Sequence, residues 1–299
     1  MNNDIRYLLG IDGGGTKTEF LLTDSDGNEI RRLFLGNSNP VNQRIENTFS
    51  VLNEGITKIC DNIDISRVSV FAGIAGSKTG ENQKLICDFL SGFGFCSSDC
   101  GSDIDLALEV ALNGENGTCV IMGTGIVAFS RSGEKLQRAG GHGYMIDKGG
   151  SGFHFGSDAL NCAFRHIDCK NGSETILRLV EKKLGKKFDS AVSEIYEGGP
   201  AFVASFAPVI FEAYRLGDTA ALKIIEQNTY EAAKVINDSR KALNLSDDKI
   251  VVCGGLCKQK DILYPCLMKY IDGDTPIIFL DKPMVNGAIT LAERLCKNA

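Results

Sequence analysis

The sequence predicts an α/β protein with two similar domains, each built on a mixed β-sheet flanked by helices. The chain has 299 residues, which is more than one ordinary hydrophobic core holds. A pattern of strand, glycine turn, strand, turn and strand occurs twice, from Tyr7 and again from Gly117. Segments with helical apolar spacing follow each copy. Two copies of one pattern indicate related domains that face each other across a central cleft.

The repeated pattern defines the first strands of each sheet. Apolar runs bounded by Gly, Asp and Ser are typical of strands joined by tight turns. The first copy has strands at 7–12, 19–23 and 28–35, and the second has strands at 118–122 and 126–129 and a further strand toward Gly140. Short turns join antiparallel neighbours, so each sheet should begin with hairpins.

The remaining elements follow from apolar spacing. Helices are predicted at 43–60, 81–92, 104–112, 173–184, 200–216, 219–243 and 286–296, and strands at 68–73 and 249–253. Gly and Asn cluster at 113–117, which predicts a domain boundary there. The expected domains are therefore 1–114 and 115–299, and the final helix at 286–297 could pack back on the first domain.

Composition and charge exclude several classes of protein. The net charge is −6, and 43% hydrophobic with 23% charged residues is ordinary for a soluble protein. Basic residues form no stripe, so we expect no nucleic-acid partner. A polar N-terminus without a signal peptide or membrane span predicts a cytoplasmic protein. The eleven cysteines lack paired C-x2-C spacing and are interpreted as reduced, small buried side chains.

The first glycine turn carries residues suited to phosphate binding. It is neither a Walker motif nor G-x-G-x-x-G, because it joins two strands instead of opening a helix. A plain hairpin turn is the simplest interpretation, but a carboxylate precedes it and hydroxyls and an ammonium follow. Asp12 could hold Mg²⁺ through water, while backbone amides and the side chains that follow meet phosphate: Gly13, Gly14, Gly15, Thr16, Lys17 and Thr18. The second turn, Gly123-Thr124-Gly125, adds a further phosphate loop.

At this point the chain resembles a known family. The segment from Leu9 to Glu19 is similar to the opening of the N-acetylglucosamine kinase branch of the actin-like sugar kinases, within the BadF/BadG/BcrA/BcrD ATPase family. Further matches run in order along residues 9–292: Ser38-Asn39, Ser102-Asp103, Gly123-Thr124-Gly125, Gly140-Gly141-His142-Gly143-Tyr144, Gly150-Ser151-Gly152, Val251-Val252-Cys253-Gly254-Gly255 and Gly287-Ala288. Single pieces are weak, but the ordered set is specific.

The resemblance implies a fold, a reaction and roles for residues. It implies two ribonuclease H-like domains and a dimer that uses ATP and Mg²⁺ to phosphorylate an N-acetylated amino sugar, at the 6-hydroxyl. The sugar would be N-acetylglucosamine and also N-acetylmuramic acid, in amino-sugar salvage or cell-wall recycling. Asp103 would be the catalytic base and Asp12 the metal ligand. Gly254 and Gly255 would lie at adenosine, and the sugar would meet Asn39, Gly141, Asp147 and Lys148.

Two positions leave alternatives open. Ser102 or Asp103 could simply cap the helix that follows, and Asp105 is a weaker candidate base. Where the family has an aspartate before its Gly-Ser-Gly segment, this chain has Lys148. Asp147 could do that work, or Lys148 could point outward without a role. A third hypothesis is that the ammonium favours an anionic sugar such as N-acetylmuramic acid.

Other functions compatible with the fold remain as alternatives. One is an ATPase activator of an acyl-CoA reductase or dehydratase, with an iron–sulfur cluster shared between two subunits. It needs surface cysteines, and Cys162 and Cys169 are the nearest candidates. Another is a sugar-sensing regulator, which would carry an added DNA-binding segment; no room for one exists before Ile5.

Overall fold

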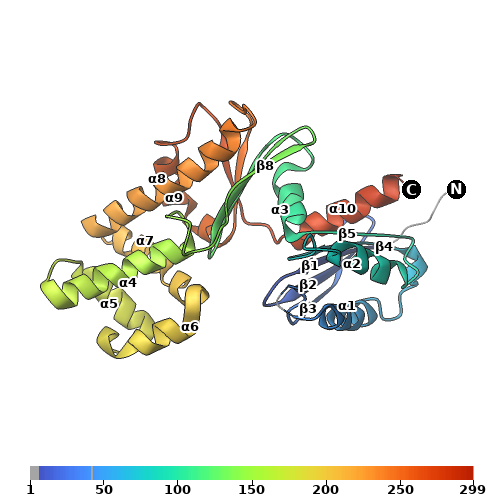
Figure 1. The fold of residues 1–299 in the computed structure, drawn as a ribbon, viewed down its shortest axis with the longest axis horizontal. Coiled ribbons are helices and arrows are strands. Elements are labelled where there is room, and N and C mark those ends of the chain that lie inside the picture. Colours follow the sequence, from blue (N-terminus) through green and yellow to red (C-terminus); the bar gives the residue numbers. More distant parts are fainter. Residues whose placement is uncertain (1–6, 42, 299) are drawn as a thin grey trace. The chain divides into compact units, whose positions relative to one another are not determined.

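The computed structural model describes residues 7–41 and 43–298, and it divides into two compact units (Figure 1). Unit 1 consists of the described parts of 1–114 and 282–299, and unit 2 of residues 115–281. The chain therefore leaves unit 1 after Gly114 and returns to it at Lys282. Each unit has its own sheet and its own hydrophobic core.

The sheet of unit 1 has five strands in the order β3-β2-β1-β4-β5. β2 pairs antiparallel with both β1 and β3, whereas β4 and β5 run parallel to β1. The sheet is therefore mixed, as predicted. Its strands are β1 (Tyr7–Gly13), β2 (Thr18–Asp24), β3 (Glu29–Leu35), β4 (Val68–Ile74) and β5 (Ser97–Gly101).

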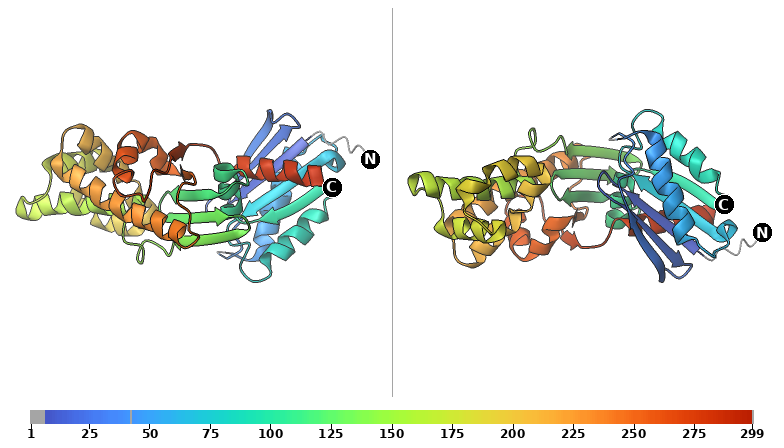
Figure 2. Two further views of the ribbon diagram at one scale, coloured as in Figure 1. Left: turned by 90° about the horizontal axis from the view of Figure 1, so that it is seen from above. Right: turned by 90° about the horizontal axis from the view of Figure 1, so that it is seen from below.

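Helices cover both faces of this sheet. Side chains alternate along β1, so Leu9 and Ile11 enter one core while Leu8 enters a second cluster on the other face. The first core includes residues of α1 (Ile45–Ile59) and α2 (Asn82–Ser91). The second cluster includes residues of α3 (Asp103–Leu112) and α10 (Val285–Asn298), and Figure 2 shows α10 along the sheet. The C-terminal helix is thus part of the core of unit 1.

Unit 2 repeats the same sheet. Its order, β8-β7-β6-β9-β10, matches that of unit 1 strand for strand. β7 pairs antiparallel with both β6 and β8, and β9 and β10 run parallel to β6. The strands are β6 (Gly117–Met122), β7 (Ile126–Ser132), β8 (Lys135–Gly140), β9 (Ile250–Cys253) and β10 (Ile277–Leu280).

The α-helices of unit 2 lie between β8 and β9, except α9, which lies between β9 and β10. One core cluster joins these helices to the sheet through buried side chains such as Phe155, Phe206 and Phe211. The helices are α4 (Gly152–Cys169), α5 (Glu174–Leu184), α6 (Val192–Ala204), α7 (Ala207–Arg215), α8 (Thr219–Lys241) and α9 (Lys260–Leu267), with short 3-10 turns at Ile65–Arg67 in unit 1 and at Phe188–Ala191 and Gly255–Gln259 in unit 2.

The predicted elements are mostly present, with one correction. The single helix expected at 200–216 is wrong, because the chain breaks between α6 and α7 at Ser205 and Phe206. Pro208 has no backbone N–H and restricts the residue before it, so a new helix begins there. α4, α9 and β10 had no predicted counterpart. Among the described helices, none is both long and apolar enough to cross a membrane.

Candidate functional site

The glycine turn of unit 1 places two carboxylates side by side. Asp12, near the end of β1, lies directly opposite Glu19 on β2, so both side chains project from one face of the sheet. The turn is closed by the Gly14 N–H, which donates to the Lys17 carbonyl oxygen over 3.0 Å. A Cβ atom at Gly13 would lie 2.4 Å from both Ile74 Cδ1 and Ser38 Oγ. A larger residue there would require both of these side chains to move.

The residues after the turn divide into exposed and buried positions. Thr16 and Lys17 are exposed, and the Lys17 ammonium lies 5.0 Å from the centre of the Phe34 ring. Thr18 is buried, with its hydroxyl 2.7 Å from the Gly36 carbonyl oxygen and 2.8 Å from Ser38 Oγ. Thr16 and Lys17 can therefore meet a ligand, whereas the Thr18 hydroxyl stabilises the loop, and we leave it out of the proposed phosphate contacts.

Asp12 has the electrostatic character of a cation ligand. Its pKa is raised to about 6, first by burial and then by the charges of Glu19 and Asp103, while the charge of Lys17 lowers it in part. A bound cation would relieve this cost of ionising the carboxylate. Within the described ranges no group of three or more His, Cys, Asp or Glu side chains could hold a metal. Asp12 would therefore hold Mg²⁺ together with water and phosphate oxygens, which is how proteins commonly bind this ion.

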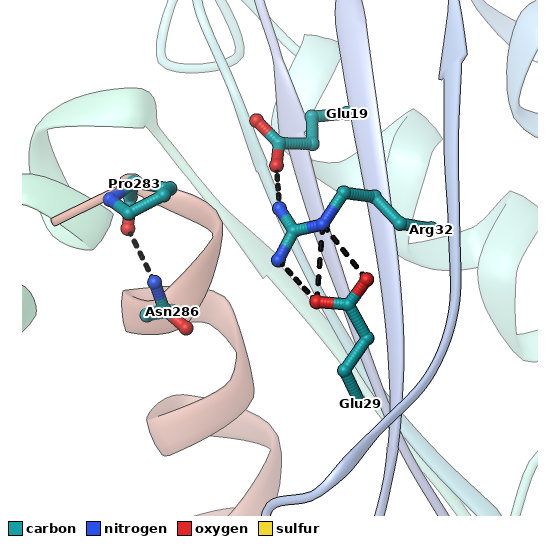
Figure 3. Close-up of polar contacts among 5 residues, drawn as sticks. All are labelled: Glu19, Glu29, Arg32, Pro283 and Asn286. Carbon is teal, nitrogen blue, oxygen red and sulfur yellow. Dashed lines mark hydrogen bonds and ion pairs between the residues drawn. The ribbon is translucent and has the colours of Figure 1, made fainter.

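Glu19 has a cationic partner on the next strand (Figure 3). Arg32 on β3 forms an ion pair with Glu19 and a second one, at 2.7 Å, with Glu29. The same view shows the start of α10, where Asn286 Nδ2 donates to the Pro283 carbonyl oxygen over 3.0 Å. Neither Glu19 nor Arg32 was predicted as a site residue. Pairing the residues of the two predicted strands across the turn would have placed Glu19 opposite Asp12.

Asp103 is the first residue of α3, and its neighbours do the capping. Ser102 is the N-cap: its backbone N–H donates to Asp105 Oδ2 over 2.8 Å, and Ser102 Oγ accepts from the Asp105 N–H over 3.4 Å. Asp105 also pairs with Lys78 at 2.9 Å. The Asp103 side chain reaches solvent, yet the surrounding protein removes part of its hydration and raises its pKa. Asp105 is therefore engaged in the cap and with Lys78, whereas the Asp103 side chain remains exposed.

The glycine turn of unit 2 is fixed to the start of α4. Within the turn, the Gly123 N–H donates to the Gly125 carbonyl oxygen over 3.0 Å. The Gly152 N–H donates to the Gly123 carbonyl oxygen over 2.7 Å, and the Phe153 N–H donates to the Thr124 carbonyl oxygen over 3.1 Å. These bonds make the turn and the helix start one rigid piece.

A cavity of about 420 Å³ lies against this turn, entirely within unit 2. It brings together Gly123, Thr124 and Gly255, three residues predicted to contact ATP. Gly254 does not line the cavity but packs against the turn: its φ is +104°, and a Cβ atom there would lie 2.6 Å from the Met122 carbonyl oxygen and 3.3 Å from the Gly123 nitrogen. Small and apolar side chains supply most of the unpredicted lining, which consists of Gly152, Ala201, Ala204, Ser205, Ala207, Pro208 and Leu256. Such a lining suits a purine base.

The residues predicted to contact the sugar lie outside that cavity. The Asp147 carboxylate accepts from the backbone N–H groups of His142, over 3.3 Å, and Gly143, over 3.1 Å. The Gly141 carbonyl oxygen accepts from the Arg138 guanidinium. Lys148 is exposed and has no ionic partner among the described residues. In unit 1, Asn39 Oδ1 accepts from the Val41 N–H over 2.8 Å.

Comparison with known proteins finds relatives along nearly the whole chain. The family model described as "BadF/BadG/BcrA/BcrD ATPase family" matches residues 9–289. A protein of Clostridium acetobutylicum named N-acetylmuramic acid/N-acetylglucosamine kinase is 27% identical over 98% of this chain and 100% of its own. An N-acetyl-D-glucosamine kinase of Dictyostelium discoideum is 28% identical over 90% of this chain and 91% of its own.

Solved structures show the same fold. A candidate N-acetylglucosamine kinase from Chromobacterium violaceum superposes with a TM-score of 0.71, at 23% identity, over 97% of this chain and 99% of the other. The two mixed sheets therefore match the two-domain actin-like fold that was predicted. Because the family model covers nearly the whole chain, this protein belongs to the BadF/BadG/BcrA/BcrD ATPase family.

Proposed function

We propose that this protein is an ATP-dependent kinase that phosphorylates N-acetylglucosamine, and also N-acetylmuramic acid, at the 6-hydroxyl. The observation that carries the proposal is the pair of carboxylates, Asp12 and Asp103, beside an exposed Thr16-Lys17 turn. Each feature matches one need of phosphoryl transfer: a cation site, a charge clamp and a proton acceptor. Relatives named as amino-sugar kinases along nearly the whole chain support the choice of substrate.

In this proposal unit 2 binds the nucleotide. The cavity beside Gly255 and Leu256 holds the base and ribose, because its wall is apolar and its size suits a small ligand. Thr124 and the amides of the Gly123–Gly125 turn meet phosphate oxygens. Since the turn is tied to α4, these groups need no rearrangement when the nucleotide arrives.

Unit 1 supplies the chemistry. Bound through Asp12, Mg²⁺ would neutralise phosphate charge, and the Lys17 ammonium and Thr16 hydroxyl add to that clamp. Asp103 accepts the proton of the sugar hydroxyl while the hydroxyl oxygen attacks the phosphorus atom of the γ-phosphate. Its raised pKa suits it to this role, because a base works best when its pKa approaches the working pH.

Lys148 sets the sugar preference in this proposal, together with Asn39, Gly141 and Asp147. Asp147 is used by the loop backbone, and Lys148 keeps its charge available to a ligand. N-Acetylmuramic acid differs from N-acetylglucosamine by a lactyl group with a carboxylate, which an ammonium attracts. Lys148→Ala should lower kcat/KM for N-acetylmuramic acid by about tenfold and that for N-acetylglucosamine by less than about twofold.

The control for this prediction is Lys135→Ala, another exposed lysine of unit 2. It should leave both sugars unaffected. Equal losses on the two sugars in Lys148→Ala would remove the specificity role and leave the kinase proposal intact.

The direct test of the function is a coupled assay of ADP release with a panel of sugars. N-Acetylglucosamine and N-acetylmuramic acid should be turned over, and N-acetylmannosamine and glucose much less. Phosphorus–proton correlation in the product identifies the phosphorylated hydroxyl. ADP release that no sugar stimulates would contradict the proposal. We further propose that the protein is a cytoplasmic homodimer that acts in sugar salvage or cell-wall recycling. Sedimentation tests whether it is a dimer.

The activator alternative gains no support from the two cysteines considered for it. Cys162 is buried and Cys169 is exposed, so they do not form a pair of surface ligands. Purification without oxygen distinguishes the functions, because a cluster protein would be brown and the kinase colourless.

A further inference from the structure

Two cysteines of unit 1 touch each other, although they lie on different elements. Cys87 is on α2 and Cys100 is on β5, and their Sγ atoms are 2.6 Å apart. Cys100 is buried and Cys87 is half-buried, so one thiol of the pair is open to solvent. We propose that Cys87 and Cys100 are a modification site at which a reversible intramolecular disulfide forms. This inference does not depend on the proposed kinase activity.

The packing of α2 on β5 already brings the two sulfur atoms into contact. A disulfide places its sulfur atoms about 2.05 Å apart, so closing this contact requires only a small side-chain movement. α2 packs on β5, and Cys100 Sγ also lies 3.1 Å from the Gln83 carbonyl oxygen, one turn before Cys87. Both elements are therefore held in place before oxidation.

The other cysteines offer a less suitable site. Cys119 and Cys253 interact with each other in unit 2, but both are buried, so an oxidant cannot reach them. Cys169 is exposed, yet it contacts no second thiol among the described residues. An exposed thiol without a neighbour can form a mixed disulfide but cannot resolve it.

The oxidant we name is a low-molecular-weight disulfide such as oxidised glutathione. The Cys87 thiolate attacks one glutathione sulfur, and the glutathione S–S bond breaks with release of one glutathione thiolate. The Cys100 thiolate then attacks Cys87 Sγ in the mixed disulfide and releases the second glutathione. Each protein thiol gives its proton to solvent or to a released thiolate. Two protein thiols are oxidised, and one glutathione disulfide is reduced to two thiols.

The surroundings of the pair predict how the rate depends on pH. The pKa of the Cys87 thiol is raised: burial raises it most, the hydrogen bond with Cys100 lowers it in part, and the Asp99 carboxylate, 3.5 Å from its sulfur, raises it again. The Cys100 thiol is the other titratable group that faces it. Exchange needs the thiolate, so oxidation should be slow at neutral pH and accelerate by about tenfold per pH unit below the pKa of Cys87.

The test treats the full-length native protein with oxidised glutathione at pH 7 and pH 8. Free thiols are then trapped by alkylation at low pH, and the digest is analysed by mass spectrometry. We expect two fewer free thiols, a peptide that links Cys87 to Cys100, and its loss after reduction. The rate should rise by about tenfold between the two pH values. Oxidation should also raise the midpoint of thermal unfolding by several degrees, because the bond closes a short loop.

Variants make the assignment specific. Cys87→Ser changes the half-buried member, so this variant should fold, and the linked peptide should disappear. Cys100→Ala removes the buried cysteine of the pair. Cys169→Ser changes the exposed cysteine of unit 2 and should form the linked peptide normally. An unchanged thiol count, a glutathione adduct that stays on Cys87, or a linkage between other cysteines would each overturn the proposal.

Discussion

The two units carry the same hairpin in the same sheet position, but the turns differ in chemistry. In unit 1 the turn between β1 and β2 has Asp12 before it, exposed Thr16 and Lys17 within it, and Glu19 opposite. In unit 2 the turn between β6 and β7 has no charged residue and is bonded to the start of α4, beside a cavity. The repeated sheet supports a charged turn in one unit and a neutral turn beside a cavity in the other.

We expect this difference between the two turns to correspond to two tasks, chemistry in unit 1 and nucleotide binding in unit 2. Burial raises the pKa of Asp12 and of Asp103, and neighbouring carboxylates add to the rise, which suits the roles proposed for them in cation binding and proton transfer. A neutral turn beside small apolar side chains favours shape recognition. We therefore expect changes in unit 1 to affect chemistry and changes in unit 2 to affect nucleotide binding and local stability.

The largest expected effect is on turnover in Asp103→Asn. An amide cannot accept the hydroxyl proton, so kcat should fall by about 10²- to 10⁴-fold, while KM for ATP changes little. The matched control is Asp105→Asn, which weakens the helix cap. It should cost about 1 kcal/mol of stability and leave kcat within about tenfold. If Asp103→Asn keeps most of its turnover, the base lies elsewhere.

A smaller effect is expected from Gly254→Val in unit 2. Both the positive φ and the close Met122 carbonyl oxygen oppose a side chain at this position. The free energy of unfolding should therefore fall by about 3 kcal/mol. Nucleotide affinity, measured by calorimetry, should fall with it. Gly125→Ala is the control for stability, because an added Cβ atom there meets no neighbour. Equal losses in both variants would show that the packing of Gly254 against the turn is not the sensitive feature.

The smallest expected effect is a gain in stability in Asp12→Asn without nucleotide. The pKa of Asp12 is raised to about 6 in the folded state. Ionisation therefore costs stability as pH rises from the unfolded value, near 3.8, through 6, and the full cost is present at pH 7.5. Asp12→Asn removes this cost. The free energy of unfolding at pH 7.5, measured by thermal unfolding, should therefore rise by on the order of 2 kcal/mol.

The pH dependence distinguishes this explanation from a general packing effect. The gain should disappear below about pH 3, where Asp12 is largely protonated in both states. Activity should be lost in the same variant, since the proposed Mg²⁺ ligand is gone. A gain that stays constant across this pH range would argue against the electrostatic origin.

The sequence predicted most strands because each is an apolar run between glycine turns, a local signal. It also pointed to Gly123, Thr124 and Gly255, which the structure places in one cavity. Pro208 could have predicted the break between α6 and α7. The helical spacing of apolar residues continues across the break, however, and favoured a single helix. α4 begins with Gly152 and contains Gly156, both poor helix formers, so its packing in the core decides its conformation.

The sequence by itself determined the duplicated strand-turn-strand pattern, the glycine turns and the position of Asp103 at the start of a helix. These depend on local spacing and on turn residues, which one sequence displays. Tertiary structure alone decided that Ser102 and Asp105 form the cap, that the Thr18 hydroxyl is buried, and that Cys87 meets Cys100. The closest cysteines along the chain were other pairs; contact across α2 and β5 depends on packing between elements, which spacing along the chain does not specify.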